Sequence, residues 1–200
     1  MLPSLAWADL TGWIVPGTVV DETPTCWSPT SSTLVAAMAS DDNNYAEDTT
    51  SCIDSLLMTN FFTTGDVPAG STIISIQVRI IDIGADVPQA NRRRLDIYVQ
   101  DEAGADTPGG IQLYQMARNA EQTTTFTQDD DLSALWSTTW VAADVVDPDF
   151  GVRLNHTDTN AVTNRVEMIE MQIEFTPPGG RSRFHIIGWL DWFKQILGVA

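Results

Sequence analysis

The sequence predicts an all-β protein, an antiparallel β-sandwich of jelly-roll-like type. Several short segments alternate apolar and polar residues with a period of two, as strands with one buried face do. Clusters of Gly, Pro and Asp separate these segments, and helical periodicity is weak before residue 177. With 200 residues and 43% hydrophobic content, the chain can bury the core of one such domain.

Four segments carry the strand signal: Ser71–Asp82, Arg94–Gln100, Phe150–Asn155 and Arg165–Phe175. The apolar set of the first is Ile74, Ile76, Val78 and Ile80. The second contributes Leu95, Ile97 and Val99, and the third contributes Phe150, Val152 and Leu154. We expect these side chains to face the core and the residues between them, such as Tyr98 and Arg153, to face solvent.

The last of these strands changes phase. Val166 and Met168 share one phase, whereas the apolar residues from Ile169 to Phe175 hold the other. A shift of one residue turns a strand's buried face outward unless a β-bulge absorbs it. The sequence therefore predicts a bulge near Met168–Glu170.

The organisation along the chain has four parts. An extended N-terminal arm (1–24) precedes the sandwich domain (25–176), and a Pro/Gly-rich hinge (177–183) follows it. Residues 184–200 then switch to the helical period and predict an amphipathic C-terminal helix. Its apolar face consists of Ile186, Trp189, Leu190, Phe193, Ile196 and Leu197.

This tail helix needs a partner, because its apolar face would otherwise be a sizeable exposed patch. We predict that the six residues form an interface with a neighbouring protein subunit, since aromatic anchors dominate such interfaces. Packing on its own sandwich and insertion at a lipid surface are the alternatives. Lys194 is the single basic residue of the helix, which disfavours lipid.

The net charge of -17 excludes some partners. An acidic surface repels phosphate backbones and anionic lipid, so no nucleic-acid partner is expected. No segment has the roughly 18–20 unbroken apolar residues of a membrane span. Because the start of the sequence lacks a secretory signal pattern, we expect a soluble protein made in a cytoplasm.

No catalytic pattern is present, so the sequence predicts a protein that is not an enzyme and has no cofactor. The two histidines, His156 and His185, lie in unrelated segments, and motifs for a nucleophile elbow, a zinc protease or a phosphate loop are absent. We therefore expect no catalytic and no cofactor-binding residues.

Two acidic clusters offer oxygen ligands of the kind that Ca²⁺ uses. One contains Asp41, Asp42, Glu47 and Asp48, and the other is Asp129–Asp131. Neither matches the EF-hand loop, and Asx turns and capping in surface loops are the favoured explanation of both. The sequence therefore predicts no metal site.

The cysteines and tryptophans leave alternatives open. Cys26 and Cys52 are either two buried thiols or one disulfide. Five of the seven tryptophans precede the hinge: Trp7, Trp13, Trp27, Trp136 and Trp140. We expect these in the core or at subunit contacts, with a sugar-stacking platform as the alternative.

The order of several motifs resembles a β-sandwich module of uncharacterised structural proteins of tailed phages and prophages. It runs over about residues 25–176 and consists of Ala39–Ala46, Leu57–Phe61, Val67–Arg79, a tryptophan loop with Trp136 and Trp140, Asp147–Leu154 and the strand Val166–Phe175. In this module, the glycine of Phe150–Leu154 stands where two chains approach closely.

The resemblance implies a structural subunit of a virus particle, most simply a capsid decoration or head-spike protein, otherwise a tail or fibre subunit. Its partners would be capsid or tail proteins and copies of itself, and its location the virion. The alternative function is a carbohydrate-binding module that attaches to a host glycan. The cysteine pair and the tail helix depart from the module's pattern.

Overall fold

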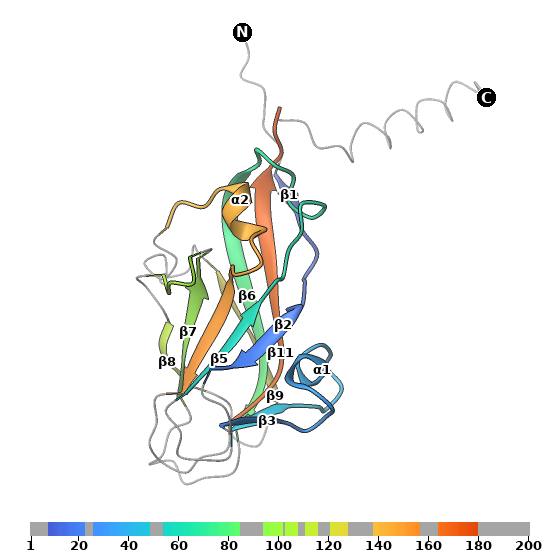
Figure 1. Cartoon of the computed structure of the whole chain (residues 1–200), viewed down its shortest axis with the longest axis vertical. Helices are drawn as coiled ribbons and strands as arrows, with labels where there is room; N and C mark the ends of the chain where they lie inside the picture. Colours follow the sequence, from blue (N-terminus) through green and yellow to red (C-terminus); the bar gives the residue numbers. More distant parts are fainter. Residues whose placement is uncertain are drawn as a thin grey trace, which may run out of the picture.

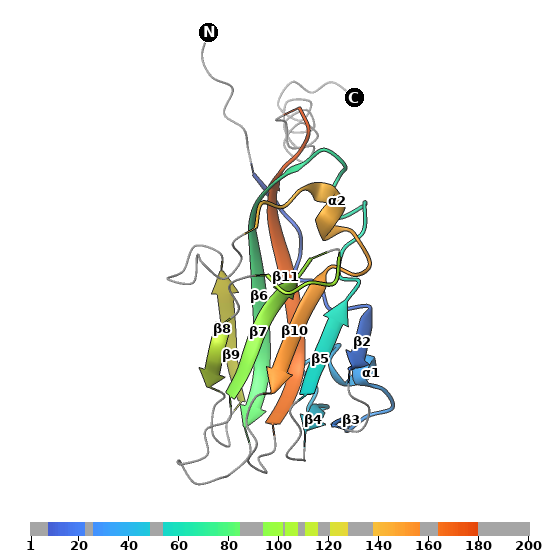
Figure 2. The same ribbon diagram turned by 60° about the vertical axis from the view of Figure 1, so that its left-hand side comes forward.

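The computed structural model describes residues 8–22, 26–48, 54–84, 94–101, 103–107, 111–115, 121–127, 138–156 and 164–179. Two antiparallel sheets pack face to face in an elongated sandwich (Figures 1 and 2). The predicted antiparallel β-sandwich is therefore confirmed.

The six-stranded sheet has the order β3-β4-β11-β6-β9, with β1 also pairing with β11. Its strands are β1 (Asp9–Leu10), β3 (Trp27–Pro29), β4 (Ala46–Asp48), β6 (Thr72–Gly84), β9 (Glu121–Thr127) and β11 (Asn164–Thr176). The five-stranded sheet has the order β2-β5-β10-β7-β8. Its strands are β2 (Thr18–Asp21), β5 (Asp54–Thr59), β7 (Arg94–Gln100), β8 (Ile111–Gln115) and β10 (Gly151–His156).

The core lies between the two sheets, where the alternating apolar residues meet. The predicted inward sets of β7 and β10 are buried, as are Ile76, Val78 and Ile80 of β6. Trp140 adds an edge-to-face contact with Phe150 at 5.2 Å between ring centroids. These strands therefore alternate as predicted, because one face of each is covered by the opposite sheet.

The predicted bulge exists in β11, but its position differs. Val166 pairs with Asp82 and Met168 with Ile81, so Glu167 is the extra residue and the shift precedes Met168–Glu170. Val166 is buried and Met168 is only half-buried, which shows that these two residues do not share a phase.

The prediction that Ile74 faces the core is wrong, since its side chain is 40% exposed. On β11, Glu174 pairs with Ser75 and the next residue, Phe175, pairs with Ile73, so a second register shift takes Ile74 out of the alternation. Ile73 packs against the core instead. A bulge on each of two neighbouring strands thus resets the alternation at both ends of the pair.

Part of the predicted N-terminal arm is paired in the sheets. β1 pairs with the end of β11, and β2 pairs with β5 over Thr18–Asp21. These short strands satisfy edge backbone groups that would otherwise face solvent. The predicted tail helix (184–200) and most of the hinge (177–183) lie outside the described residues.

Two one-turn helices complete the described elements. α1 (Leu34–Ala37) begins at Thr33, whose side chain accepts a hydrogen bond from the backbone N–H of Ala36. α2 (Ala142–Val145) lies near one end of the sandwich (Figure 1).

At Gly151 an added Cβ would lie 1.9 Å from the carbonyl oxygen of Met58, so glycine is required where β10 approaches β5.

Candidate functional site

The outward face of the five-stranded sheet carries a row of side chains across four adjacent strands. Strand register aligns Val20 with Leu57, Leu57 with Arg153, and Arg153 with Tyr98. We call these four residues the outer row. With neighbouring strands about 4.8 Å apart, the outer row spans about 14 Å, a length that suits a few sugar rings.

Arg153 is the fixed centre of the outer row. Its Nε lies 2.8 Å from Glu22 Oε2, and its Nη2 donates to Glu22 Oε1 at 3.0 Å. On the other side, Nη1 lies 2.7 Å from Asp106 Oδ1. A guanidinium held by two carboxylates in this way presents a rigid polar surface.

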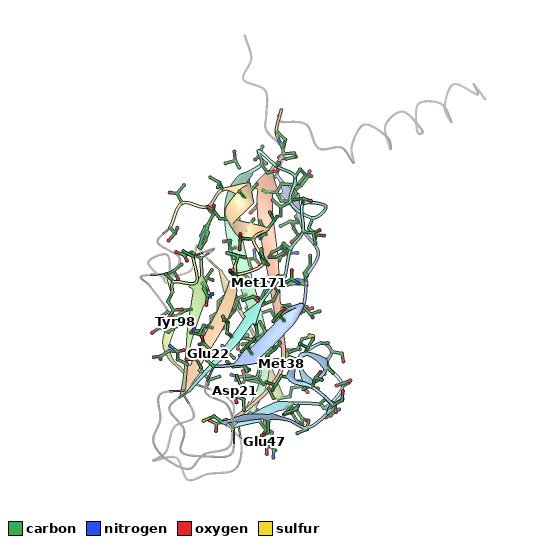
Figure 3. All side chains as sticks on the ribbon, in the orientation of Figure 1. Asp21, Glu22, Met38, Glu47, Tyr98 and Met171 are labelled. Carbon is green, nitrogen blue, oxygen red and sulfur yellow. The ribbon has the colours of Figure 1, made fainter. Side chains whose placement is uncertain are left out.

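Tyr98 supplies the aromatic ring of the outer row. Tyr98 is a half-buried residue of β7 and pairs with Arg153 of the neighbouring strand β10. Figure 3 shows Tyr98 and Glu22 on the side of the five-stranded sheet. Partial burial raises the pKa of the Tyr98 hydroxyl, and the charges of Asp96 and Asp106 raise it further. The phenol is therefore a neutral hydrogen-bonding group next to an apolar ring face.

Burial also raises the pKa of the Asp106 carboxyl, although the adjacent Arg153 guanidinium opposes this shift. The charge of Glu22 adds to the upward shift. Desolvation therefore outweighs the ion pair at Asp106. The pair with Arg153 offsets only part of the cost of burying this carboxylate.

A second polar row runs beside the outer row. Register places Asn155 of β10 between Ser55 and Asp96. The Ser55 hydroxyl donates to Asn155 Oδ1 at 2.7 Å. Hydroxyl, amide and carboxylate groups therefore flank the outer row and can exchange hydrogen bonds with a hydroxyl-rich ligand.

The described tryptophans among those considered for sugar stacking lie outside the outer row. Trp27 and Trp140 are 3% and 6% exposed and belong to the core. Trp13 is half-buried against the other sheet's Arg79, whose Cζ lies 4.4 Å from the ring centroid. Trp7 and Trp136 lie outside the described residues. Burial excludes Trp27 and Trp140 from a sugar-stacking platform, and Trp13 is not part of the outer row. Tyr98 is the aromatic residue of that row, which alternation placed outward.

The first acidic cluster of the sequence is divided by the fold. Glu47 pairs with Arg165 on β11, and Figure 3 places it on the six-stranded sheet. Asp48 is buried in β4. Asp42 accepts a hydrogen bond from the backbone N–H of Asn44, which forms the expected Asx turn, whereas Asp41 comes close to acidic residues of β9 and β11.

The remaining predicted site residues have different outcomes. Cys26 is disulfide-bonded, which decides between the two alternatives for this residue, while Cys52 lies outside the described part of the chain. The tail-helix residues Ile186, Trp189, Leu190, Phe193, Ile196 and Leu197 also lie outside it, and their interface role stays a prediction. The side chain of His156, at the end of β10, and Asp129–Asp131 are likewise outside.

The part of the chain that the structure describes contains no helix with the length and hydropathy of a membrane span.

No family model and no curated protein matches this chain. Solved structures with similar folds include the CBM22-1 xylan-binding domain from Paenibacillus barcinonensis Xyn10C, at 12% identity and a TM-score of 0.36 over 84% of this chain and 88% of that one. An F5/8 type C domain of a Bacteroides fragilis protein has 11% identity and a TM-score of 0.33 over 78% and 97%. The family 29 carbohydrate-binding module CBM29_1 from Piromyces equi has 7% identity and a TM-score of 0.30 over 89% and 97%. At such scores these likenesses carry no ligand over to this chain.

Proposed function

We propose that this chain is a non-catalytic carbohydrate-binding module and that the outer row is its ligand surface. The observation that carries the proposal is the position of Tyr98 beside Arg153, on the solvent side of a five-stranded sheet. Sugar rings have apolar C–H faces that pack on aromatic rings and hydroxyl groups that need donors and acceptors. The outer row and its polar neighbours offer both.

The ligand of this surface is a neutral glycan. Glu22, Asp96 and Asp106 surround the outer row, and Arg153 is already paired with two of them. The whole chain carries a net charge of -17. A polysaccharide with carboxylate or sulfate groups would meet like charge here, whereas a neutral one would not.

Affinity electrophoresis in gels containing a soluble polysaccharide tests this proposal. The panel consists of galactomannan, hydroxyethyl cellulose and dextran as neutral glycans and alginate as an anionic one. We expect retardation of the full chain in at least one neutral gel and none in alginate. Tyr98→Ala should abolish the retardation, because it removes the stacking ring without touching the core.

Tyr45→Ala is the matched control, since Tyr45 is a half-buried tyrosine beside β4 of the other sheet. It should bind as the unmodified chain does. The proposal is wrong if no neutral glycan retards the chain, or if Tyr98→Ala is retarded as strongly as the control.

We also propose that the setting of this module is the particle of a tailed phage. The order of motifs between Ala39 and Phe175 supports this setting, and so does the disulfide of Cys26, because disulfides persist outside the reducing cytoplasm. In this setting the tail helix would be the anchor and the outer row the displayed surface.

Light scattering after size exclusion tests the anchor. The full chain should be a defined oligomer, and a chain that ends at Gly180 should be a folded monomer. Two identical monomers would contradict the anchor role and would favour packing of the tail on its own sandwich. Neither result bears on glycan binding by the outer row, so the two proposals fail independently.

A further inference from the structure

Three carboxylates from distant segments converge beside the six-stranded sheet. Asp41 lies in the loop between α1 and β4, Glu121 begins β9, and Glu167 is the extra residue of the β11 bulge. One oxygen from each of the three lies within 4.8 Å of the others. We call these residues the acidic trio.

Glu167 is the buried member of the acidic trio, with 0% of its surface exposed. Its Oε1 accepts a hydrogen bond from the backbone N–H of Asn43. Its Oε2 is also buried and has no partner in full hydrogen-bond geometry among the described residues, although the backbone N–H of Asp42 also approaches the carboxyl. Because a buried charged oxygen without a partner is costly, this atom requires a group of positive charge or a donor.

The surroundings of Glu167 make this requirement stronger. Burial raises the pKa of the Glu167 carboxyl, hydrogen bonds from the backbone N–H groups of Asn43 and Asp42 oppose this shift, and the charges of Asp41 and Glu121 add to it. Among the described residues, the ion pairs of arginine use other partners, as Arg165 does with Glu47. Within the described ranges, the acidic trio therefore gathers like charges without an ion pair to an arginine.

The spacing suits a calcium ion. Oxygen ligands lie about 2.3–2.6 Å from Ca²⁺, so two ligands on opposite sides of one ion are at most roughly 5 Å apart. The acidic trio falls within this limit. Asp41 and Glu121 are exposed, which leaves room for water molecules to complete the coordination. Mg²⁺ fits less well, since it demands near-ideal octahedral geometry.

We propose that the acidic trio is a binding site for a divalent cation, with calcium as the preferred ion. The ion would join the α1–β4 loop to strands β9 and β11. This loop already reaches the bulge through Asn43, which has a φ of 64° and turns its backbone N–H toward Glu167. Calcium would therefore stabilise the loop and the end of the sheet where β11 begins.

Isothermal titration of the chelator-stripped full chain with CaCl2 is the first test, with thermal unfolding in calcium or EDTA as the second. We expect one calcium site and a higher Tm in calcium. MgCl2 should give a weaker response. Glu167→Gln and Asp41→Asn should both lose the binding heat and the calcium-dependent rise in Tm.

Two matched controls should keep the full response. Glu174→Gln changes another acidic residue of β11, and Asp149→Asn changes another exposed aspartate. Because Asp41 is an exposed loop residue, Asp41→Asn should fold normally and keeps the test decisive even if Glu167→Gln unfolds.

Two results would overturn the proposal. One is the absence of binding heat and of any Tm shift up to about 10 mM calcium, beyond the range of weak extracellular calcium modules. The other is a full calcium response in Asp41→Asn, which would place the ion elsewhere. Loss of glycan binding in Tyr98→Ala has no bearing on either result.

Discussion

The outer row and the acidic trio lie on opposite sheets and handle negative charge in different ways. At the outer row, Glu22 and Asp106 bracket the guanidinium of Arg153 at 2.8 and 2.7 Å. In the acidic trio, three carboxylates approach one another, and the buried Oε2 of Glu167 has no partner in full hydrogen-bond geometry among the described residues. Within the part of the chain that the structure describes, a basic side chain balances the carboxylates in the first region and not in the second.

This difference shows why a net charge of -17 says little about any one surface. Acidic residues that face a fixed arginine form a polar surface whose negative charge is partly balanced, and such a surface suits an uncharged ligand. Acidic residues that face only one another create a local demand for a cation. Strand pairing decides between the two outcomes.

Replacing Arg153, the central residue of the outer row, should change stability more than any other substitution in either region. Arg153→Met leaves the carboxylates of Glu22 and Asp106 facing each other, so the outer row would come to resemble the acidic trio. Because the Arg153 side chain is only 18% exposed, we expect a loss of about 2 kcal/mol in the free energy of unfolding. Urea denaturation measures it.

Arg153→Lys is the control for this change, since it keeps the charge and loses the two-sided geometry. Arg153→Lys should lower the free energy of unfolding by less than Arg153→Met does. Equal stability of Arg153→Met and the unmodified chain would contradict the view that the arginine balances the outer row.

Removing one charge from the acidic trio should raise the free energy of unfolding, whereas Arg153→Met should lower it. In EDTA, Glu167→Gln relieves repulsion from Asp41 and Glu121 and keeps an oxygen that can accept from the Asn43 N–H. We expect a gain of about 1 kcal/mol in the free energy of unfolding, measured by urea denaturation in EDTA. Glu174→Gln should change stability by less than about 0.5 kcal/mol.

A clear loss of stability in Glu167→Gln under EDTA would mean that the charge of Glu167 is balanced by the protein. The negative charge of the acidic trio would then be balanced by the protein, as it is at the outer row.

The pH dependence of the outer row should show the smallest effect. Burial holds the pKa of Asp106 above its usual value of 3.8. The contribution of such a group to stability is full below its unfolded pKa and is lost as the pH rises through the folded pKa. The stability of the unmodified chain relative to Asp106→Asn should therefore fall between about pH 3 and pH 6, by less than about 1 kcal/mol.

Denaturant unfolding of both chains across this pH range measures the difference. A relative stability that rises with pH would mean that the Arg153 ion pair outweighs burial at Asp106.

The sequence was sufficient for much of the fold. Alternation identified four long strands and placed Tyr98 and Arg153 on the solvent side, because a period of two directly reports which face is buried. The change of phase between Met168 and Ile169 also indicated a bulge, which the structure places slightly earlier, between Val166 and Met168. The same reasoning failed at Ile74, because a second bulge on the paired strands resets the phase without a visible sign in the alternation.

The two candidate sites depend on information that alternation does not contain. Arg153 and Tyr98 become neighbours only because β10 pairs with β7, a connection between distant parts of the chain. Asp41, Glu121 and Glu167 meet through a loop, a strand start and a bulge, and the phase change that predicts the bulge does not show that these three residues lie together. The first acidic cluster of the sequence was instead divided by the fold.

The central claim is that the outer row, and not the acidic trio, contacts the glycan. Affinity electrophoresis of the unmodified chain, Tyr98→Ala and Asp41→Asn on one gel with a neutral polysaccharide tests it most directly. The account predicts that Tyr98→Ala runs unretarded while Asp41→Asn is retarded like the unmodified chain. Retardation of Tyr98→Ala together with free migration of Asp41→Asn would contradict it.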